Sequence, residues 1–223
     1  MFKFISLALL AVFASAATKA NLDVERVTFP SFAKMFHPNL HVGSVEWHER
    51  LSIFEAEVRK IRTHNADSKK SFTMGLNKFS ASTQKEKRVV LGRRADMEQA
   101  HEPKKVIEEH GFTMKPIADL PVEIDWTETL GTAVKDQGHC GSCFAFAASA
   151  MLEDYTQLST GLQFNLSPQM GASCTPNPGN CGGSGGCEGG TAEIIFDYLA
   201  NGGGIMAQEY QYGYTASYGE DPG

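Results

Sequence analysis

A cysteine that stands immediately before an apolar helical pattern is the feature that most constrains the fold of this 223-residue chain. Across residues 142–158 the apolar side chains recur at steps of three and four, which predicts a buried helix that begins at Cys143 and ends at Gly161. The stripe expected on its buried face consists of Phe144, Ala147, Ala148, Met151, Leu152 and Tyr155. A helix N-terminus stabilises a thiolate through the helix dipole and its unpaired amides. The pattern therefore predicts that the Cys143 thiol stands at the first turn of a buried helix, where its thiolate form is favoured.

The five cysteines all lie between residues 140 and 187. Such clustering is typical of disulfides formed in an oxidising compartment. A redox pair made by Cys140 and Cys143 would need a preceding βαβ pattern, and the sequence has none there. A zinc site would need paired C-x2-C knuckles, which the sequence lacks. If Cys143 is free, the other four cysteines allow three pairings, and the residues alone do not choose among them.

The first residues have the composition of a secretory signal peptide. Lys3 gives a positive start, residues 4–13 form a short apolar run, and residues 14–16 (Ala-Ser-Ala) form a small-residue cleavage site. The apolar run is shorter than the roughly 20 residues needed to cross a bilayer. We therefore expect residues 1–16 to be removed, and the protein to follow the secretory route to a lysosome, a vacuole or the extracellular space without membrane attachment.

Charge is divided unevenly along the chain. Residues 17–119 hold 18 Lys and Arg against 14 Asp and Glu, whereas residues 120–223 hold one lysine against 12 Asp and Glu. The basic segment can therefore attract the acidic one at neutral pH, although ordinary surface charge explains the split equally well. The acidic part would repel phosphate, which argues against nucleic acid as a partner.

The clearest pattern before residue 120 is an amphipathic helix over residues 45–65. Its bulky apolar residues recur at steps of three and four and are Trp47, Leu51, Phe54, Val58 and Ile61. Ser44 is the expected N-cap. Glu46 and Arg50 stand four residues apart and can form an ion pair along the helix surface.

The polar residues of this helix match the pattern of a known family. Glu46, Arg50, Phe54, Ile61 and Asn65 have the spacing of an E-x3-R-x3-F-x2-N-x3-I-x3-N helix, with Glu57 at the first N position. Residues 75–81 (Gly-Leu-Asn-Lys-Phe-Ser-Ala) are similar to G-x-N-x-F-x-D, with Ala81 in place of the acid. Both stretches resemble the propeptides of cathepsin L-like cysteine proteases of the papain family. The resemblance implies an inhibitory propeptide whose later part, residues 84–115, lies along the active-site cleft; a solvated linker is the alternative for that part.

The sequence after residue 119 resembles the start of a mature papain-family enzyme. The resemblance is carried by residues 120–126 (Leu-Pro-Val-Glu-Ile-Asp-Trp), 137–144 (Gln-Gly-His-Cys-Gly-Ser-Cys-Phe), 166–169 (Leu-Ser-Pro-Gln) and 186–190 (Gly-Cys-Glu-Gly-Gly). It implies that Cys143 is the nucleophile and that Gln137 is a donor of the oxyanion hole. It also implies that Gly189 and Gly190 bind the substrate backbone.

The same resemblance implies a disulfide between Cys140 and Cys187 and a partner beyond residue 223 for Cys174, and it assigns nothing to Cys181. Two shorter helices are predicted from the residues themselves. One follows Ser167 as N-cap with proline at the first helical position. The other covers residues 192–200, with Thr191 as cap and Gly202 as stop.

The family fold is α+β, with a helical left domain and a β-rich right domain on either side of the cleft. The chain then divides into a signal peptide (1–16), a mainly helical propeptide (17–119) and the left part of the peptidase domain (120–223), while the right domain is largely absent. Pro116 and Pro121 flank a stretch unsuited to helix, so we expect processing near residues 118–120.

No histidine follows Cys143, although the family's histidine and asparagine stand roughly 130–150 residues after the cysteine. We therefore expect the precursor of a cysteine endopeptidase, present here as a fragment that lacks the general base and does not hydrolyse peptides by itself. The implied partners are a peptide or protein substrate and the chain's own propeptide, with no cofactor and no metal. The alternative is a non-catalytic, propeptide-type inhibitor of related proteases.

Overall fold

The computed structural model describes residues 22–94, 115–127 and 129–216. The predicted signal peptide lies outside these residues. The chain forms two compact units, Met1–Thr83 and Gln84–Gly223, and each is considered by itself. No helix in the described ranges has both the length and the apolar character that crossing a membrane requires.

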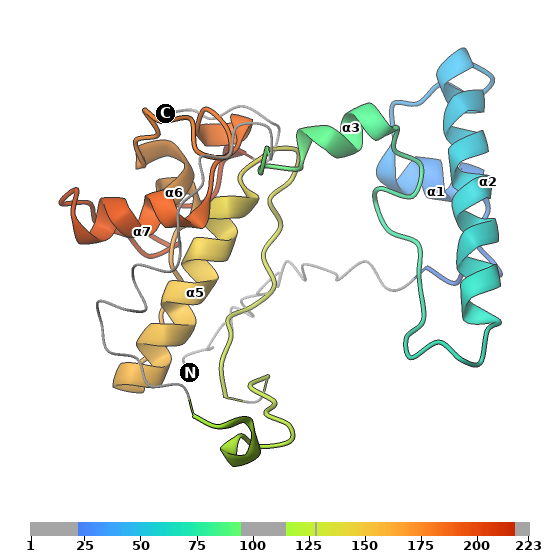
Figure 1. Ribbon diagram of the computed structural model, residues 1–223. Helices are drawn as coiled ribbons and strands as arrows, with labels where there is room; N and C mark the ends of the chain where they lie inside the picture. The colour runs from blue at the N-terminus through green and yellow to red at the C-terminus, as the bar shows by residue number, and fades with distance from the viewer. Residues whose placement is uncertain (1–21, 95–114, 128, 217–223) are drawn as a thin grey trace, which may run out of the picture. The chain divides into compact units, whose positions relative to one another are not determined.

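The first unit is built on an aromatic core between the helices α1 (Phe29–Phe36) and α2 (Val45–Asn65) (Figure 1). The ring of Phe29 lies edge-on to Trp47 at 4.8 Å, and Phe32 packs 4.9 Å from Phe54 between ring centroids. The predicted bounds of α2 are confirmed, and so is its cap, because the Ser44 hydroxyl accepts a hydrogen bond from the Trp47 amide at 3.0 Å.

The polar residues of α2 fasten the segment that follows it. Asn65 pairs with Met74 through both its amide oxygen (2.7 Å) and its amide nitrogen (2.8 Å). Arg50 pairs with Glu46 at 2.9 Å, as predicted. However, Arg50 is buried rather than on the surface, and its guanidinium also donates to the Ala81 carbonyl at 3.2 Å. The arginine therefore anchors the backbone at the position where the family pattern has an acid.

The second unit is organised around the long helix α5 (Cys143–Thr160), which packs against α6 (Pro168–Cys174) and α7 (Ala192–Ala200) (Figure 1). The other helical segments among its described residues are α3 (Gln84–Val89) and the 3₁₀ turns Ile117–Asp119 and Gly186–Glu188. The core consists of Phe144, Ala145, Ala148, Ala172 and Ile195. The exposed stretch between Pro116 and Pro121 was predicted to be unsuited to helix. It contains no α-helix, but it forms the first of these 3₁₀ turns.

The ends of α5 are confirmed, since it begins at Cys143 and Gly161 closes it with a φ of 73°. The predicted buried stripe is partly wrong. Ala147, Met151 and Tyr155 are exposed, and the buried face consists of Phe144, Ala145, Ala148, Ser149 and Glu153. The reason is that α5 is apolar around most of its circumference at its start, so spacing alone does not select the face that meets α6 and α7.

The two shorter helices begin where predicted. The Ser167 hydroxyl accepts from the Met170 amide at 3.1 Å and caps α6. Thr191 precedes α7, but its hydroxyl makes no capping bond. The described ranges contain isolated β-bridges, Leu22 with Leu76 and Leu166 with Gln208, and no strand. Of the expected α+β fold, the described residues thus supply the helical portion.

Candidate active site

The thiol of Cys143 stands at the first residue of α5 and is half-buried and free. The loop in front of it is tied down by a disulfide between Cys140 and Cys187. The Gly141 amide also donates to the Cys187 carbonyl at 3.0 Å. Residues 140–143 are therefore fixed against the 3₁₀ turn that precedes Gly189.

The side-chain amide of Gln137 is oriented beside this loop. Its nitrogen donates to the Cys140 carbonyl at 2.8 Å and to the Val90 carbonyl at 2.9 Å. An amide nitrogen carries two hydrogens, so one bond holds the group in its own loop and the other is directed at an external carbonyl. The arrangement places a hydrogen-bond donor ready for a peptide oxygen next to Cys143.

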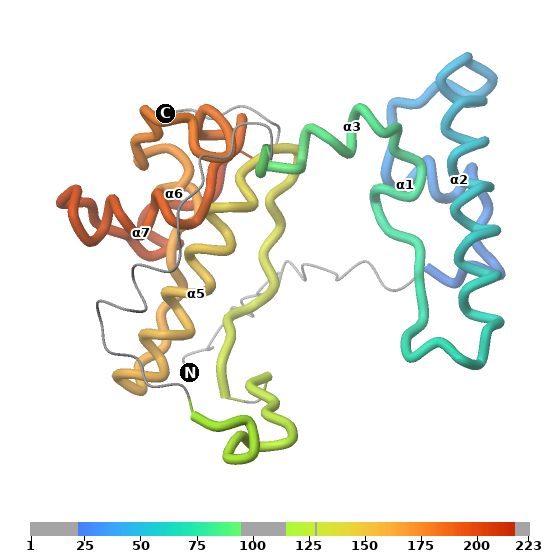
Figure 2. Tube along the Cα trace, viewed as in Figure 1, coloured from blue at the N-terminus to red at the C-terminus, as the bar shows by residue number. Residues whose placement is uncertain are grey.

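That external carbonyl belongs to an extended segment, residues 90–94, of the same unit. The Gly92 carbonyl accepts from the Gly190 amide at 2.8 Å, and the Arg94 amide donates to the Gly182 carbonyl at 2.8 Å. The bonded residues of the segment alternate, which is the pattern of an extended chain paired along one edge. In Figure 2 the green end of the trace after α3 lies near the yellow stretch that leads into α5.

Glycines on both sides allow this close approach. A Cβ atom added to Gly92 would overlap the Gly141 carbonyl oxygen and lie 2.9 Å from the Cys143 sulfur. A Cβ atom added to Gly189, whose φ is 97°, would overlap the Gly92 carbonyl. A Cβ atom added to Gly190 would instead lie 3.0 Å from the Phe144 ring, so this glycine packs closely on α5. The segment therefore passes over the thiol as bare backbone.

The outer end of the extended segment carries charge. The Arg94 guanidinium lies 3.6 Å from the Glu188 carboxylate, and both side chains are more than half exposed. Solvent screens such a pair, so it contributes little to the free energy of binding. The main-chain bonds and the close backbone contacts dominate here.

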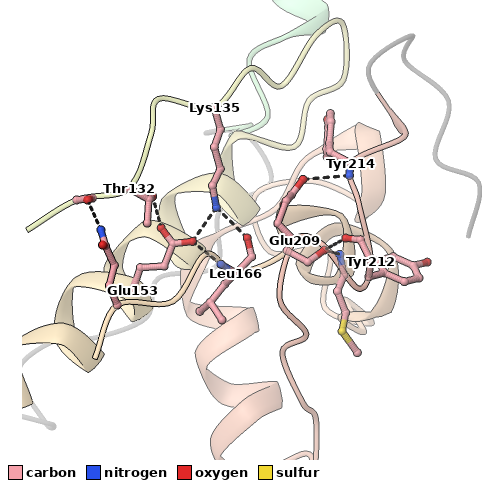
Figure 3. Close-up of polar contacts among 11 residues, drawn as sticks. Thr132, Lys135, Glu153, Leu166, Glu209, Tyr212 and Tyr214 are labelled. Atoms are coloured by element: carbon pink, nitrogen blue, oxygen red, sulfur yellow. Dashed lines mark hydrogen bonds and ion pairs between the residues drawn. The ribbon is translucent and has the colours of Figure 1, made fainter. Parts of the chain in front are cut away.

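An ion pair with a buried carboxylate joins Lys135, two residues before Gln137, to Glu153 of α5 (Figure 3). The Lys135 ammonium lies 2.7 Å from the Glu153 carboxylate, whose side chain is only 2% exposed. The same carboxylate accepts from the Thr132 hydroxyl and the Leu166 amide, each at 2.6 Å. The Lys135 ammonium also donates to the Leu166 carbonyl at 2.8 Å. Sequence reasoning missed this network, although Lys135 is the one lysine after residue 119 and is a visible signal.

The structure thus brings together Cys143, Gln137, Gly189 and Gly190, the four residues assigned by resemblance to catalysis and substrate binding. His139, which stands nearest to the thiol in sequence, is exposed. The chain has no histidine after Cys143. The assembled groups can attack a carbonyl, bind its oxygen and hold an extended backbone, and a part of the chain occupies that position.

Two family models match the sequence. Residues 120–221 match the papain family cysteine protease, and residues 39–86 match the cathepsin propeptide inhibitor domain. Procathepsin L of Rattus norvegicus is 35% identical over 191 residues, covering 83% of this chain and 53% of the relative. Cathepsin L1 of Drosophila melanogaster is 33% identical over 219 residues, covering 94% of this chain and 57% of the relative. The chain spans about half the length of the curated relatives it matches.

Solved structures give the same relationship. Digestive procathepsin L2 from the larval midgut of Tenebrio molitor superposes with a TM-score of 0.65 at 26% identity, covering 84% of this chain and 59% of that one. The recombinant stem bromelain precursor gives a TM-score of 0.60 at 27% identity, covering 84% and 56%.

Proposed function

Because the chain belongs to the papain family of cysteine proteases and carries a cathepsin propeptide inhibitor domain, we propose that the whole protein is the zymogen of a cysteine endopeptidase. Cys143 is its nucleophile and Gln137 donates to the oxyanion. Gly189 and Gly190 bind the substrate backbone. The substrate is a peptide or a protein, bound in an extended conformation.

One observation carries this proposal: a peptide already lies where a substrate would. The Val90 carbonyl accepts from the Gln137 amide, the Gly92 carbonyl accepts from the Gly190 amide, and Gly92 lies against the Cys143 thiol. Main-chain pairing along an edge is the usual way to bind an extended peptide with little regard to its side chains. The chain's own propeptide therefore acts as an intramolecular inhibitor.

The reaction follows from these positions. The Cys143 thiolate attacks the substrate carbonyl carbon, and the electron pair of the C=O bond moves to the oxygen. The Gln137 side chain and the amide at the start of α5 stabilise that oxyanion. When the tetrahedral intermediate collapses, the C–N bond breaks and the amine leaves with a proton. Water then hydrolyses the thioester and restores the thiol.

The proton transfers need a general base, and the described part of the second unit (84–94, 115–127 and 129–216) shows no hydrogen bond between Cys143 and a histidine. No histidine follows Cys143, and His139 is exposed on the loop before α5. We propose that the imidazole comes from a β-rich right domain encoded outside these 223 residues, so the chain as given is inactive. The domain limits proposed are 1–16, 17–119 and 120–223, with release of the propeptide by cleavage near the exposed turn Ile117–Asp119. The secretory route and a lysosomal, vacuolar or extracellular destination belong to the same proposal.

The experiment is expression of the complete reading frame beside a Cys143→Ser variant and beside residues 1–223 alone. We expect the complete protein to hydrolyse a fluorogenic peptide after its propeptide is removed, and the other two proteins to show no turnover. Hydrolysis by the Cys143→Ser protein would refute the assignment of the nucleophile. Inhibition of related proteases without any turnover by the complete protein would instead establish the non-catalytic inhibitor, which the matched peptidase segment at residues 120–221 does not favour.

A further inference from the structure

We infer that Tyr214 is a positioning residue that fixes the Gln137 donor relative to the Cys143 thiol; the inference rests on the function proposed above. Its hydroxyl lies 2.7 Å from the Ser142 hydroxyl and 2.9 Å from the Gln137 carbonyl oxygen. Ser142 directly precedes the nucleophile and is fully buried. One phenol therefore joins the residue before the thiol to the residue that carries the oxyanion donor.

The direction of these two hydrogen bonds is determined. A backbone carbonyl only accepts, so the Tyr214 hydroxyl donates its single hydrogen to Gln137. The Ser142 hydroxyl must then donate to the Tyr214 oxygen. Ser142 stands at the N-cap position of α5, and its hydroxyl makes no capping bond to the helix amides. The chain of hydrogen bonds from Ser142 through Tyr214 to Gln137 thus uses both hydroxyl hydrogens.

Tyr214 is itself held from three directions. Its ring packs edge-on against Phe146, in the first turn of α5, with ring centroids 4.9 Å apart. Its backbone amide donates to the Glu209 carboxylate at 3.1 Å (Figure 3). The next two amides, of Thr215 and Ala216, both donate to the buried Gln169 side chain, at 2.9 and 3.0 Å. The phenol is thus attached through Phe146 to α5 and through the two following amides to α6.

This attachment matters because it completes the fixation of Gln137. The Cys140 carbonyl holds the side-chain amide, and Tyr214 holds the backbone carbonyl of the same residue. Loss of the second attachment lets the loop shift and moves the donor away from the oxyanion. An oxyanion forms only after attack, so a displaced donor lowers kcat and leaves the KM nearly unchanged.

A purely structural tyrosine would behave differently, and Tyr214→Phe separates the two cases. The phenylalanine keeps the ring packing against Phe146 and removes only the hydroxyl. In the complete, processed protein we expect kcat to fall about ten- to a hundredfold, which is the cost of a small misplacement of a catalytic group. In a Gln137→Ala background the same substitution should change kcat less than about twofold, because the group that Tyr214 positions is gone.

Ser142→Ala is the matched variant, because it removes the donor to Tyr214 and leaves the bond from Tyr214 to Gln137 in place. We expect a smaller fall in kcat, about fivefold, again absent in the Gln137→Ala background. If Tyr214→Phe does not accumulate as a folded protein, Ser142→Ala provides the test in its place.

An equal fall in both backgrounds, or kcat within about twofold of the unmutated protein, would overturn the inference. If the unmutated protein itself shows no hydrolysis that depends on Cys143, both the proposed function and the inference about Tyr214 are refuted. Intact activity that is insensitive to the variants refutes the inference alone.

Discussion

Gly92→Ala should release the extended segment, residues 90–94, from the thiol. The added methyl group would overlap the Gly141 carbonyl oxygen and approach the Cys143 sulfur to 2.9 Å. Gly92 does not have a positive φ, so alanine is compatible with its backbone. The steric overlap is entirely with residues 141–143, in the loop before α5 and at its first residue. That loop cannot retreat, because the Cys140–Cys187 disulfide and the Gly141 amide bond hold it.

The magnitude follows from the contacts that the segment loses when it lifts. Three hydrogen bonds hold it, from the Gln137 side chain and the Gly190 amide to the segment, and from the Arg94 amide to Gly182. Each contributes about 1 kcal/mol, so the closed state loses about 3 kcal/mol relative to the open one. Every 1.4 kcal/mol is tenfold, so the fraction of molecules with an accessible thiol should rise about a hundredfold.

Alkylation of the 223-residue chain by iodoacetamide, followed by peptide mass spectrometry, measures that accessibility and needs no catalysis. Cys174 and Cys181 are also free and serve as internal references whose rates should not change. Leu91→Ala is the matched control, because the Leu91 side chain is 64% exposed and its removal leaves the backbone contacts intact. A Cys143 rate in Gly92→Ala within twofold of the unmutated chain would show that the segment does not cover the thiol.

Three other substitutions test separate parts of the second unit. Glu153→Gln leaves the Lys135 charge buried without its counter-charge, so the free energy of unfolding in urea should fall by about 3 kcal/mol; a loss below about 1 kcal/mol would mean that the pair is solvated. Cys187→Ser opens a disulfide that spans 47 residues and should cost about 4 kcal/mol in the same assay, an effect that a reducing agent should reproduce on the unmutated chain. The Thr127 hydroxyl and amide hold the pKa of Asp125 below its usual range, so Thr127→Ala should raise that pKa in an NMR titration. Because the folded state favours the ionised carboxylate, the stabilisation by Thr127 is present above the ordinary carboxyl pKa and is lost as the pH falls; an unchanged titration would contradict it.

Local patterns predicted the helices better than the faces they bury. The bounds of α2 and its Ser44 cap followed from residues within one turn of each other, as did the Gly161 end of α5. The buried face of α5 did not, because it depends on where α6 and α7 pack. Tyr155 has the right spacing and hydrophobicity for the core, yet it is 66% exposed.

The supporting residues of the candidate site were beyond sequence reasoning for a related reason. Glu153 and Tyr214 carry no local signal, since the partners of the Glu153 carboxylate lie 13 to 21 residues away in sequence and those of the Tyr214 hydroxyl lie 72 to 77 residues away. Gly92 stands in a charged stretch for which a solvated linker and a segment bound at the active site were equally consistent with composition. Only the positions of Gly141 and Gly190 in space distinguish these two interpretations.

The reciprocal glycines also bear on how this inhibitor can evolve. Gly92 contacts residues 141–143 without a side chain, and Gly189 contacts Gly92 without one. The contact between these two segments therefore does not depend on side-chain identity at Gly92 or Gly189. The shared features are a shape and a spacing of main-chain groups, which neighbouring substitutions leave unchanged. The residues around Gly92 are then free to diverge between lineages. If the proposed function holds, the extended segment should pair with any active-site loop that keeps glycine at the position of Gly189, and discrimination among such enzymes must come from other parts of the propeptide.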